Sequence, residues 1–378
     1  MSEKVLITGA RAPASLDLAR AFRLGGYGVQ LADSVPAYAA KLSEFRPIMR
    51  LPKPRFDFTA FAQLLDEFCI DNPEAVILPT CEEVFFVSAA AQKHGFGAQV
   101  LTSDLNTLRK LHSKIEFPSL LQSLGLPTPQ TRILDGPIDH TECRDVVLKP
   151  EFSRFGSATI IRPDRRAMRR IIPSPMHRWA CQEYIAGEEH CLWSMAREGS
   201  IVASVVYRPK WRHGRTAAYA FEAVEAPGAL TIASRLAKSL GYTGQLALDL
   251  IRTADGEFVP IECNPRAVSG VHLFDGKASL AKAIMGDGPA VEVTTGLRYL
   301  APAMWLMGLP KSLVEGRFRE WRGDMSAGRD ALGHGEGFAP IAGALLDAAR
   351  FAALGLTRLR SPAGQTTDDI EWNGEAIA

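Results

Sequence analysis

The first hundred residues alternate between short apolar runs and longer segments that repeat apolar positions with a helical period. The short runs are strand-sized and are bounded by turn residues, whereas the longer segments space their apolar residues by three and four positions. The predicted strands cover residues 5–8, 28–33 and 75–78, and the predicted helices cover residues 16–24, 58–69 and 84–94. Strands that alternate with helices predict a parallel, doubly wound sheet, which is an α/β arrangement.

From residue 113 onward the pattern changes to longer strands that follow one another more directly. Gly125 and Gly241 each follow a segment with helical periodicity and supply the expected stop signals. The predicted helices cover residues 114–124, 229–240 and 341–354, and the predicted strands cover residues 145–150, 160–161, 180–186, 190–195 and 201–210. This part of the chain is therefore predicted to be α+β.

Two strand-like runs, residues 244–250 and 258–264, are joined by a turn at Asp255 and Gly256. Asp249 lies on the first run, and Glu262 and Asn264 lie two positions apart on the second, so a strand's period of two places that pair on one face. A half-buried hairpin with polar outer positions would show a similar alternation. Buried charge at the end of an apolar run is costly unless it is paired or bound to metal, which favours a metal site.

Carboxylate and amide oxygens are ligands that suit Mg²⁺, with water and phosphate oxygens completing its octahedron. Arg266, just beyond the second run, is placed to neutralise charge on a phosphoryl group during transfer. The run Glu262 to Arg266 resembles the metal motif of the ATP-grasp superfamily, in its carbamoyl-phosphate-synthase-like and biotin-carboxylase-like branches. The resemblance implies Asp249, Glu262 and Asn264 as ligands of Mg²⁺ or Mn²⁺, with Asn264 and Arg266 as the catalytic residues.

The same resemblance extends to the residues that would contact nucleotide phosphates. Lys114 begins the segment that looks like the entrance to an ATP-grasp domain, and Lys149 ends an apolar strand, where a buried cation needs an anion beside it. A loop with Gly and hydroxyl residues follows, and such loops fold backbone N–H groups over phosphates. Its expected nucleotide contacts are Ser153, Gly156 and Ser157. The loop holds fewer glycines than family lids usually do.

A break at Gly187 separates two predicted strands, and such a hinge leaves backbone groups free to read an adenine edge. The resemblance implies Glu183, Tyr184 and Ile185 at the adenine and Glu189 at the ribose, with Glu188 as the alternative if the register shifts by one. It also implies a phosphate contact from a basic residue after the next strand, for which the candidates are Arg208 and Lys210.

Two side chains of the N-terminal part are candidates for contacts to the second substrate. Arg11 follows the first strand, and Glu82, with its neighbour Glu83, follows the third, so both lie at the carboxyl edge where open α/β sheets bind ligands. Alternatively, Arg11 is a surface cation, and the two glutamates complement a helix dipole. The segment 8–13 lacks the G-x-G-x-x-G spacing of a dinucleotide site, which disfavours an NAD(P) oxidoreductase.

Composition and charge narrow the functional class. The chain has 378 residues and a net charge of +1, which argues against broad capture of nucleic acid or anionic membrane. Six cysteines without any C-x-x-C pair favour reduced thiols over a disulfide framework or zinc site. The N-terminus lacks a signal-peptide apolar region, and the apolar runs are too short to span a bilayer, so we expect a cytoplasmic protein.

Together these features predict an N-terminal Rossmann-like parallel-sheet domain followed by a two-lobed ATP-grasp domain. The expected divisions are residues 1–110 for the N-terminal domain, 111–186 and 187–290 for the two lobes, and 291–378 for a helical or irregular C-terminal segment. The function implied is an ATP-dependent carboxylate–amine ligase that forms an amide through an acyl phosphate. Its partners would be a small-molecule carboxylate and an amine, with a homodimer as one assembly open to it. The alternatives are a bicarbonate-using carboxylase and a non-catalytic nucleotide-binding module.

Overall fold

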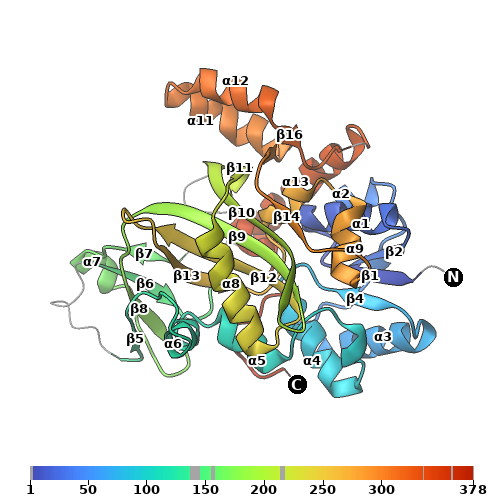
Figure 1. The fold of residues 1–378 in the computed structure, drawn as a ribbon, viewed down its shortest axis with the longest axis horizontal. Coiled ribbons are helices and arrows are strands. Elements are labelled where there is room, and N and C mark those ends of the chain that lie inside the picture. The colour runs from blue at the N-terminus through green and yellow to red at the C-terminus, as the bar shows by residue number, and fades with distance from the viewer. Residues whose placement is uncertain are drawn as a thin grey trace.

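The computed structural model describes residues 3–136, 145–154, 158–212, 218–334, 336–358 and 361–377. The described chain forms three sheets, with helices packed around them (Figure 1). This arrangement is α/β in the N-terminal part and α+β in the remainder, as the pattern of apolar positions predicts.

The N-terminal sheet is parallel throughout and has the order β3-β2-β1-β4. Its strands are β1 (Lys4–Thr8), β2 (Gly28–Asp33), β3 (Met49–Arg50) and β4 (Val76–Leu78). Its helices are α1 (Pro13–Leu24), α2 (Tyr38–Lys41), α3 (Phe58–Asp71) and α4 (Val84–His94), followed by the short η1 (Gly97–Gln99). Each strand and helix predicted for this region is confirmed, because buried parallel strands and amphipathic helices leave distinct periodic signals.

The second sheet is antiparallel and has the order β5-β8-β6-β7; we call it lobe A. Its strands are β5 (Thr131–Leu134), β6 (Val146–Pro150), β7 (Ile160–Ile161) and β8 (Trp179–Glu183). Helices α5 (Leu105–His112) and α6 (Glu116–Ser123) lead into it, and α7 (Arg165–Met168) lies between β7 and β8.

The third and largest sheet, which we call lobe B, has the order β13-β12-β9-β10-β11-β15-β16, with β14 also paired to β10. Its five longer strands are β9 (Glu188–Arg197), β10 (Ser200–Arg212), β11 (Ala218–Ala223), β12 (Gly244–Arg252) and β13 (Phe258–Asn264). Its short strands are β14 (Val291–Val293), β15 (Leu297–Tyr299) and β16 (Arg329–Asp330). Helix α8 (Pro227–Leu240), as predicted, precedes the β12–β13 hairpin.

The two faces of the lobe B sheet have different partners. Leu192, Leu248 and Leu250 share one hydrophobic core with α8, so α8 covers that face. Trp193 and Tyr207 lie on the other face and share a second core with α1, η2 (Ser269–Phe274) and α9 (Ala278–Met285). The second face therefore joins lobe B to the N-terminal domain.

The C-terminal quarter is mostly helical. It contains α10 (Ala301–Ala303), η3 (Met304–Gly308), α11 (Leu309–Val314), α12 (Phe318–Ala327), α13 (Ala339–Arg358) and α14 (Pro362–Gln365). Helices α11 and α12, coloured orange, extend away from the sheets, and α13 lies against the N-terminal domain (Figure 1). Of the described helices, only α13 has the length and apolar composition of a membrane span. Its buried Asp347 accepts 2.9 Å hydrogen bonds from the backbone N–H groups of Tyr38 and Ala39, which dock it on α2.

Candidate active site

The β12–β13 hairpin carries its acidic and amide side chains on one face of the sheet. Asp249 lies directly opposite Glu262 in the antiparallel register, and Asn264 lies two positions farther along β13. The Asn264 amide is 3.5 Å from Asp249 Oδ2, and the Cys191 thiol on β9 lies 3.4 Å from Asp249 Oδ1. The face is the one opposite α8, so these oxygens point toward lobe A and the N-terminal domain.

The electrostatics of this face fit a bound cation. Burial, together with the neighbouring charge of Glu262, raises the pKa of Asp249 to about 6. Two facing carboxylates repel one another until a cation lies between them. Within the described residues, no cluster of three His, Cys, Asp or Glu side chains could hold a metal alone. Two carboxylates and an amide oxygen instead match Mg²⁺, which takes its remaining ligands from water and phosphates.

Two lysines from lobe A reach the same place. Lys114 Nζ donates to the carbonyl of Ser153 at 2.9 Å and lies 3.4 Å from Glu262 Oε1. Lys149 Nζ, on β6, donates to Gln182 Oε1 at 2.9 Å and to the carbonyl of Ile261 on β13 at 3.2 Å. Both cations are almost wholly buried, and burial lowers the pKa of Lys149. Buried cations at the junction of two lobes create a site for anions.

Arg266 follows β13 and completes the cluster on the side of the N-terminal domain. Its Nη2 donates to Asn264 Oδ1 at 3.2 Å, and its Nε pairs with Glu82 Oε1 at 2.6 Å. The second oxygen of Glu82 lies 2.8 Å from Arg154 Nε. Burial alone would raise the pKa of Glu82, but Arg154 and Arg266 outweigh it and hold the pKa far below its ordinary value. Glu82 is thus a buried carboxylate that positions two arginines.

The hinge connects β8 of lobe A to β9 of lobe B. A Cβ on Gly187 would collide with the backbone carbonyl of Arg252 at the end of β12. The hinge therefore approaches β12 as closely as glycine allows. Glu183 Oε2 accepts from the N–H of Gln130 at 3.1 Å, and the N–H of Tyr184 donates to the carbonyl of Asp145 at 3.0 Å. The Glu183 carboxylate and the Tyr184 N–H therefore already have protein partners.

The strand register separates Glu189 from Glu188. Glu189 shares the face of Cys191 and Asp249, because residues two apart on β9 point the same way, and it forms an ion pair with Arg212. Glu188 points to the opposite face. Of the two glutamates, Glu189 therefore lies on the face that carries Asp249 and Glu188 does not.

Several predicted contacts lie elsewhere. Arg208 stands on the face opposite Asp249 and is 3.5 Å from Glu222, and Lys210 is 2.7 Å from Asp324 on α12. Both side chains are therefore paired with acids other than Asp249 and Glu262. Gly156 and Ser157 lie outside the described residues. Ser153 contributes its carbonyl to Lys114, while its hydroxyl lies 3.4 Å from the carbonyl of Pro150.

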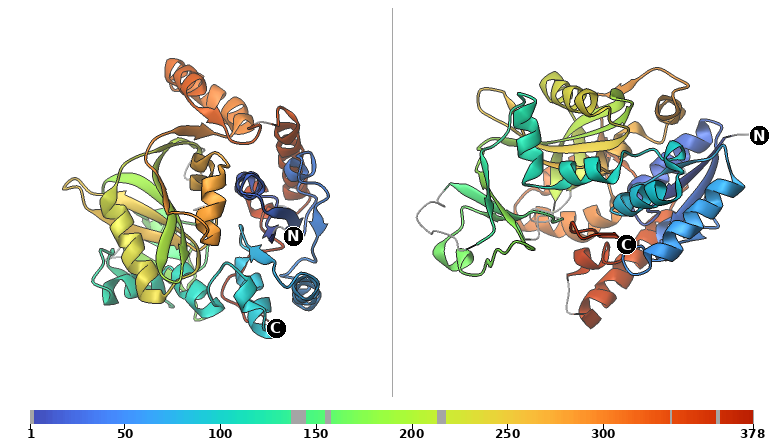
Figure 2. Two further views of the ribbon diagram at one scale, coloured as in Figure 1. Left: turned by 45° about the vertical axis from the view of Figure 1, so that its right-hand side comes forward. Right: turned by 90° about the horizontal axis from the view of Figure 1, so that it is seen from below.

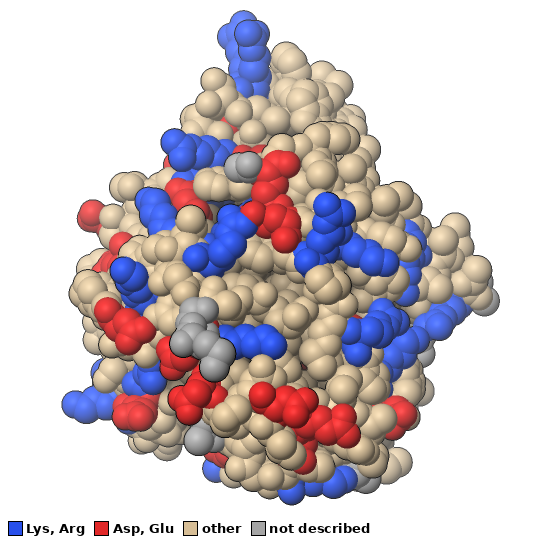
Figure 3. Space-filling model, turned by 90° about the vertical axis from the view of Figure 1, so that its right-hand side faces the viewer, with Lys and Arg blue, Asp and Glu red and all other residues tan. Residues whose placement is uncertain are grey.

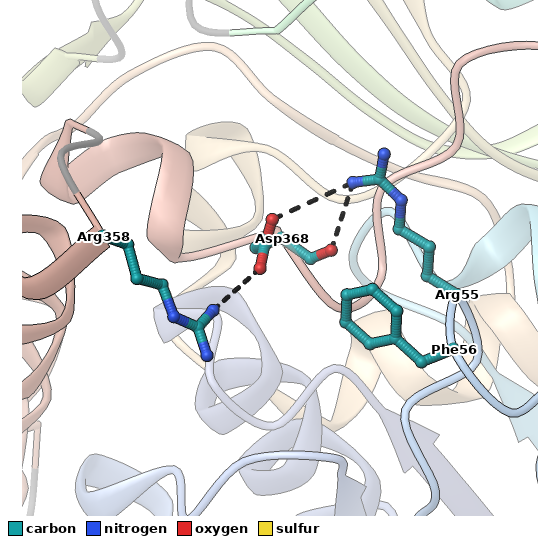
Figure 4. Close-up of a pocket in the computed structure, with 4 residues that line it drawn as sticks. All are labelled: Arg55, Phe56, Arg358 and Asp368. Carbon is teal, nitrogen blue, oxygen red and sulfur yellow. Dashed lines mark hydrogen bonds and ion pairs between the residues drawn. The ribbon is translucent and has the colours of Figure 1, made fainter.

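Arg11 is neither a surface cation nor open to a ligand. It forms a bidentate pair with Asp33 and another with Asp369 from the C-terminal tail, at 2.6–3.2 Å. Sequence reasoning missed this partner because no local pattern links residues 358 positions apart. A cavity of about 490 Å³ opens beside the tail and is lined by Arg55, Phe56, Arg358 and Asp368 (Figure 4).

Surface charge gives no sign of a nucleic-acid interface on the side of the N-terminal domain. Basic and acidic side chains are interspersed over that face rather than gathered into one basic patch (Figure 3). The net charge of the whole chain is +1.

No family model and no curated protein matches the chain. Solved structures do resemble it. An L-amino acid ligase from Bacillus licheniformis aligns at a TM-score of 0.55 and 16% identity, over 75% of this chain and 74% of that one. A phosphoribosylamine–glycine ligase from Thermotoga maritima aligns at a TM-score of 0.56 and 15% identity, over 78% of each chain. An N5-carboxyaminoimidazole synthetase from Staphylococcus aureus aligns at a TM-score of 0.61 and 11% identity, over 83% of this chain and 87% of that one.

These three proteins share one architecture with the chain despite low sequence identity. The alignments cover about three-quarters or more of this chain, so they include most of its three sheets. The chain has the fold of the ATP-grasp ligases.

Proposed function

We propose that this protein is an ATP-dependent ligase that joins a carboxylate to an amine and releases ADP and phosphate. The observation that carries the proposal is the meeting of the Asp249, Glu262 and Asn264 oxygens with Lys114 and Lys149 at the junction of the lobes. Anion-binding cations and cation-binding oxygens at one place suit a nucleotide triphosphate with its metal. The fold neighbours, which include an L-amino acid ligase, support the same reaction class.

In the proposed mechanism the chain acts by positioning and by electrostatics. Asp249, Glu262 and Asn264 would hold Mg²⁺, or Mn²⁺ in its place, and the metal would neutralise charge on the phosphates. Lys114 and Lys149 bind phosphate oxygens, and Arg266 faces the transferred phosphoryl group or the substrate carboxylate. A carboxylate oxygen attacks the γ-phosphorus as the bond to ADP breaks. An amine then displaces phosphate from the acyl phosphate to give the amide.

The hinge completes the nucleotide site. We place the adenine against the backbone near Ile185 and the ribose near Glu189, which lies on the same face of the sheet as Asp249. Exclusion of water from the junction of the lobes would protect the acyl phosphate from hydrolysis. The protein would act on small molecules in the cytoplasm, with a homodimer as its proposed assembly.

The variant Glu262→Gln tests the metal assignment. It keeps the shape of the side chain but removes a charged ligand, and the lost stabilisation of several kcal/mol corresponds to about a thousandfold slower ADP formation. The matched control is Glu257→Gln, an exposed residue on the turn before the same strand. Near-normal ADP formation by Glu262→Gln, with Tm unchanged in both variants, would refute the assignment.

A bicarbonate-using carboxylase is the second candidate. Two fold neighbours favour it: the N5-carboxyaminoimidazole synthetase, and the biotin carboxylase of Campylobacter jejuni at a TM-score of 0.58 and 14% identity. Radiolabelled bicarbonate separates the two reactions. Label fixed into product together with ADP release would establish the carboxylase, whereas hydroxamate formation from an organic carboxylate would establish the ligase.

A further inference from the structure

The C-terminal tail, residues 366–373, lies in the crevice at the carboxyl edge of the N-terminal sheet. Asp369 makes two hydrogen bonds to the Arg11 guanidinium, at 2.7 and 2.9 Å, and accepts one from Ser34 Oγ. Burial alone would raise the pKa of Asp369, but Arg11 outweighs it and leaves the pKa below its ordinary value. This edge is where open α/β sheets bind their ligands, and here a carboxylate of the chain itself occupies it.

The next residues of the tail fill the crevice further. Glu371 forms ion pairs with Arg55 and Arg154, and the carbonyl of Trp372 accepts from Arg154 as well. Trp372 is only 2% exposed, and its ring centroid lies 4.9 Å from that of Phe85. The right-hand view of Figure 2 shows this dark red segment running beside the cyan helices of the N-terminal half.

The tail touches the candidate active site through a short chain of contacts. Arg154, which binds Glu371, also pairs with Glu82, and Glu82 pairs with Arg266 beside Asn264. A ligand that replaced the tail would therefore meet the same arginines that border the proposed phosphoryl-transfer site. An acceptor substrate needs that position.

The way in which the tail is held distinguishes it from a strand of the fold. Its only described backbone hydrogen bond to the N-terminal domain joins the N–H of Arg55 to the carbonyl of Asp369, at 3.2 Å. Its other described anchors are side-chain interactions: ion pairs, the Trp372 ring, and hydrogen bonds that Arg11, Arg55 and Arg154 donate to carbonyl groups of the tail. Segments without ladder hydrogen bonds open at lower free energy than core strands. The 490 Å³ cavity at Asp368 offers open space beside the segment.

The charges of the crevice indicate which other ligand could occupy it. Three arginines of the crevice, Arg11, Arg55 and Arg154, form ion pairs with three acids of the tail, Asp368, Asp369 and Glu371. Phe85 and Phe152 add an apolar wall that Trp372 covers. A replacement ligand would carry a carboxylate for the arginines and an apolar or aromatic group for the wall.

We propose that this crevice is a binding site for a carboxylate-bearing substrate with an apolar group, and that residues 366–373 are its tethered competitor. The assignment of the ligand as a substrate rests on the proposed ligase function. Occupation by the tail keeps the acceptor side of the site closed, and substrate binding displaces the tail. A tethered segment acts at an effective concentration of the order of millimolar, so it competes strongly with free ligands.

The test uses the full-length chain and a fluorescent synthetic peptide with the sequence of residues 366–377. The variant Asp369→Asn weakens the anchor on Arg11, and Glu74→Gln, an exposed acid in the loop after α3, makes the same change in charge as a control. We expect the peptide to bind Asp369→Asn at least tenfold more tightly than wild type or Glu74→Gln. A peptide with Asn at the position of Asp369 should bind at least tenfold more weakly.

Hydrogen exchange supplies a readout that does not depend on catalysis. Amides of residues 366–373 should exchange at least tenfold faster in Asp369→Asn than in wild type, while amides of β1 and β9 keep their rates. The proposal would be overturned if the peptide bound to none of the chains and the tail amides exchanged as slowly as those of β1. Loss of β1 protection would reveal general unfolding, in which case Glu371→Gln replaces Asp369→Asn with the same expected results. Failure of the ligase assay alone would refute only the proposed function.

Discussion

Individual charged residues explain why this site would bind a nucleotide rather than merely stabilise the fold. Lys114 and Lys149 are 3% and 4% exposed, and their protein partners are mostly neutral oxygens. Glu82 is different, because two arginines already neutralise it. A buried cation without a full counter-ion costs stability, and a phosphate removes that cost.

Replacement of Lys149 tests this reasoning. Lys149→Met keeps the side-chain length and removes the buried charge, so the free energy of unfolding should change by less than about 1 kcal/mol or increase. The dissociation constant for ATP should rise at least tenfold, because a phosphate contact is lost. Calorimetry with Mg²⁺-ATP measures the binding, and Lys110→Met, an exposed residue on α5, serves as the control. Unchanged ATP affinity in Lys149→Met would count against the site.

His112 predicts a pH dependence of stability. Both of its ring nitrogens lack a hydrogen-bond partner among the described residues, and burial lowers its pKa well below the ordinary 6.5. Glu82 opposes that shift, whereas Lys114, Arg154 and Arg266 reinforce it. The unfolded chain thus binds a proton that the folded chain does not, and stability falls as pH drops below about 6.5.

The variant His112→Phe removes this titration. It keeps an aromatic ring at position 112. The ring centroid of His112 lies 5.1 Å from that of Phe85 and 5.8 Å from that of Phe152. Between pH 6.5 and 5, its free energy of unfolding should fall less steeply than that of wild type, by up to about 1.4 kcal/mol per pH unit. Urea denaturation at a series of pH values measures this difference. Parallel pH profiles for the two chains would show that His112 is not responsible.

Secondary-structure elements differ in how well the sequence predicts them. The β12–β13 hairpin was predictable because a period of two fixes the face of Glu262 and Asn264, and the register then brings Asp249 opposite. The position of the C-terminal tail was not predictable, because Asp369 contacts Arg11 only in the folded chain. The ion pairs of Arg208 with Glu222 and of Lys210 with Asp324 were not predictable either, because they depend on strand pairing, on a bulge near Pro209 and on the position of α12.

The hinge between β8 and β9 makes a prediction at the scale of elements. Gly187→Ala places a Cβ against the carbonyl of Arg252, so β9 must shift away from β12. Overpacking of this kind costs about 1–3 kcal/mol of the free energy of unfolding, and ATP affinity should fall with it. Gly97→Ala is the control, because a Cβ there meets no atom within 4 Å. Equal stability of the two variants in urea would contradict the close approach.

At the scale of the whole molecule, the fold brings three separately predicted parts to one place. Lobe A supplies Lys114 and Lys149, lobe B supplies Asp249 and Glu262, and the N-terminal domain supplies Glu82. No single element contains the proposed site, so the proposed activity would depend on the packing of all three sheets. The tail adds a fourth contribution, from the far end of the chain.

The most direct test of the central claim measures ADP release from Mg²⁺-ATP across a panel of carboxylates, with hydroxylamine present to trap an acyl phosphate. The account predicts that one carboxylate yields both ADP and its hydroxamate in equal amounts, and that Glu262→Gln yields neither. If ATP does not bind in the presence of Mg²⁺, or if ADP forms from a carboxylate without any hydroxamate, the proposed acyl-phosphate ligase is contradicted.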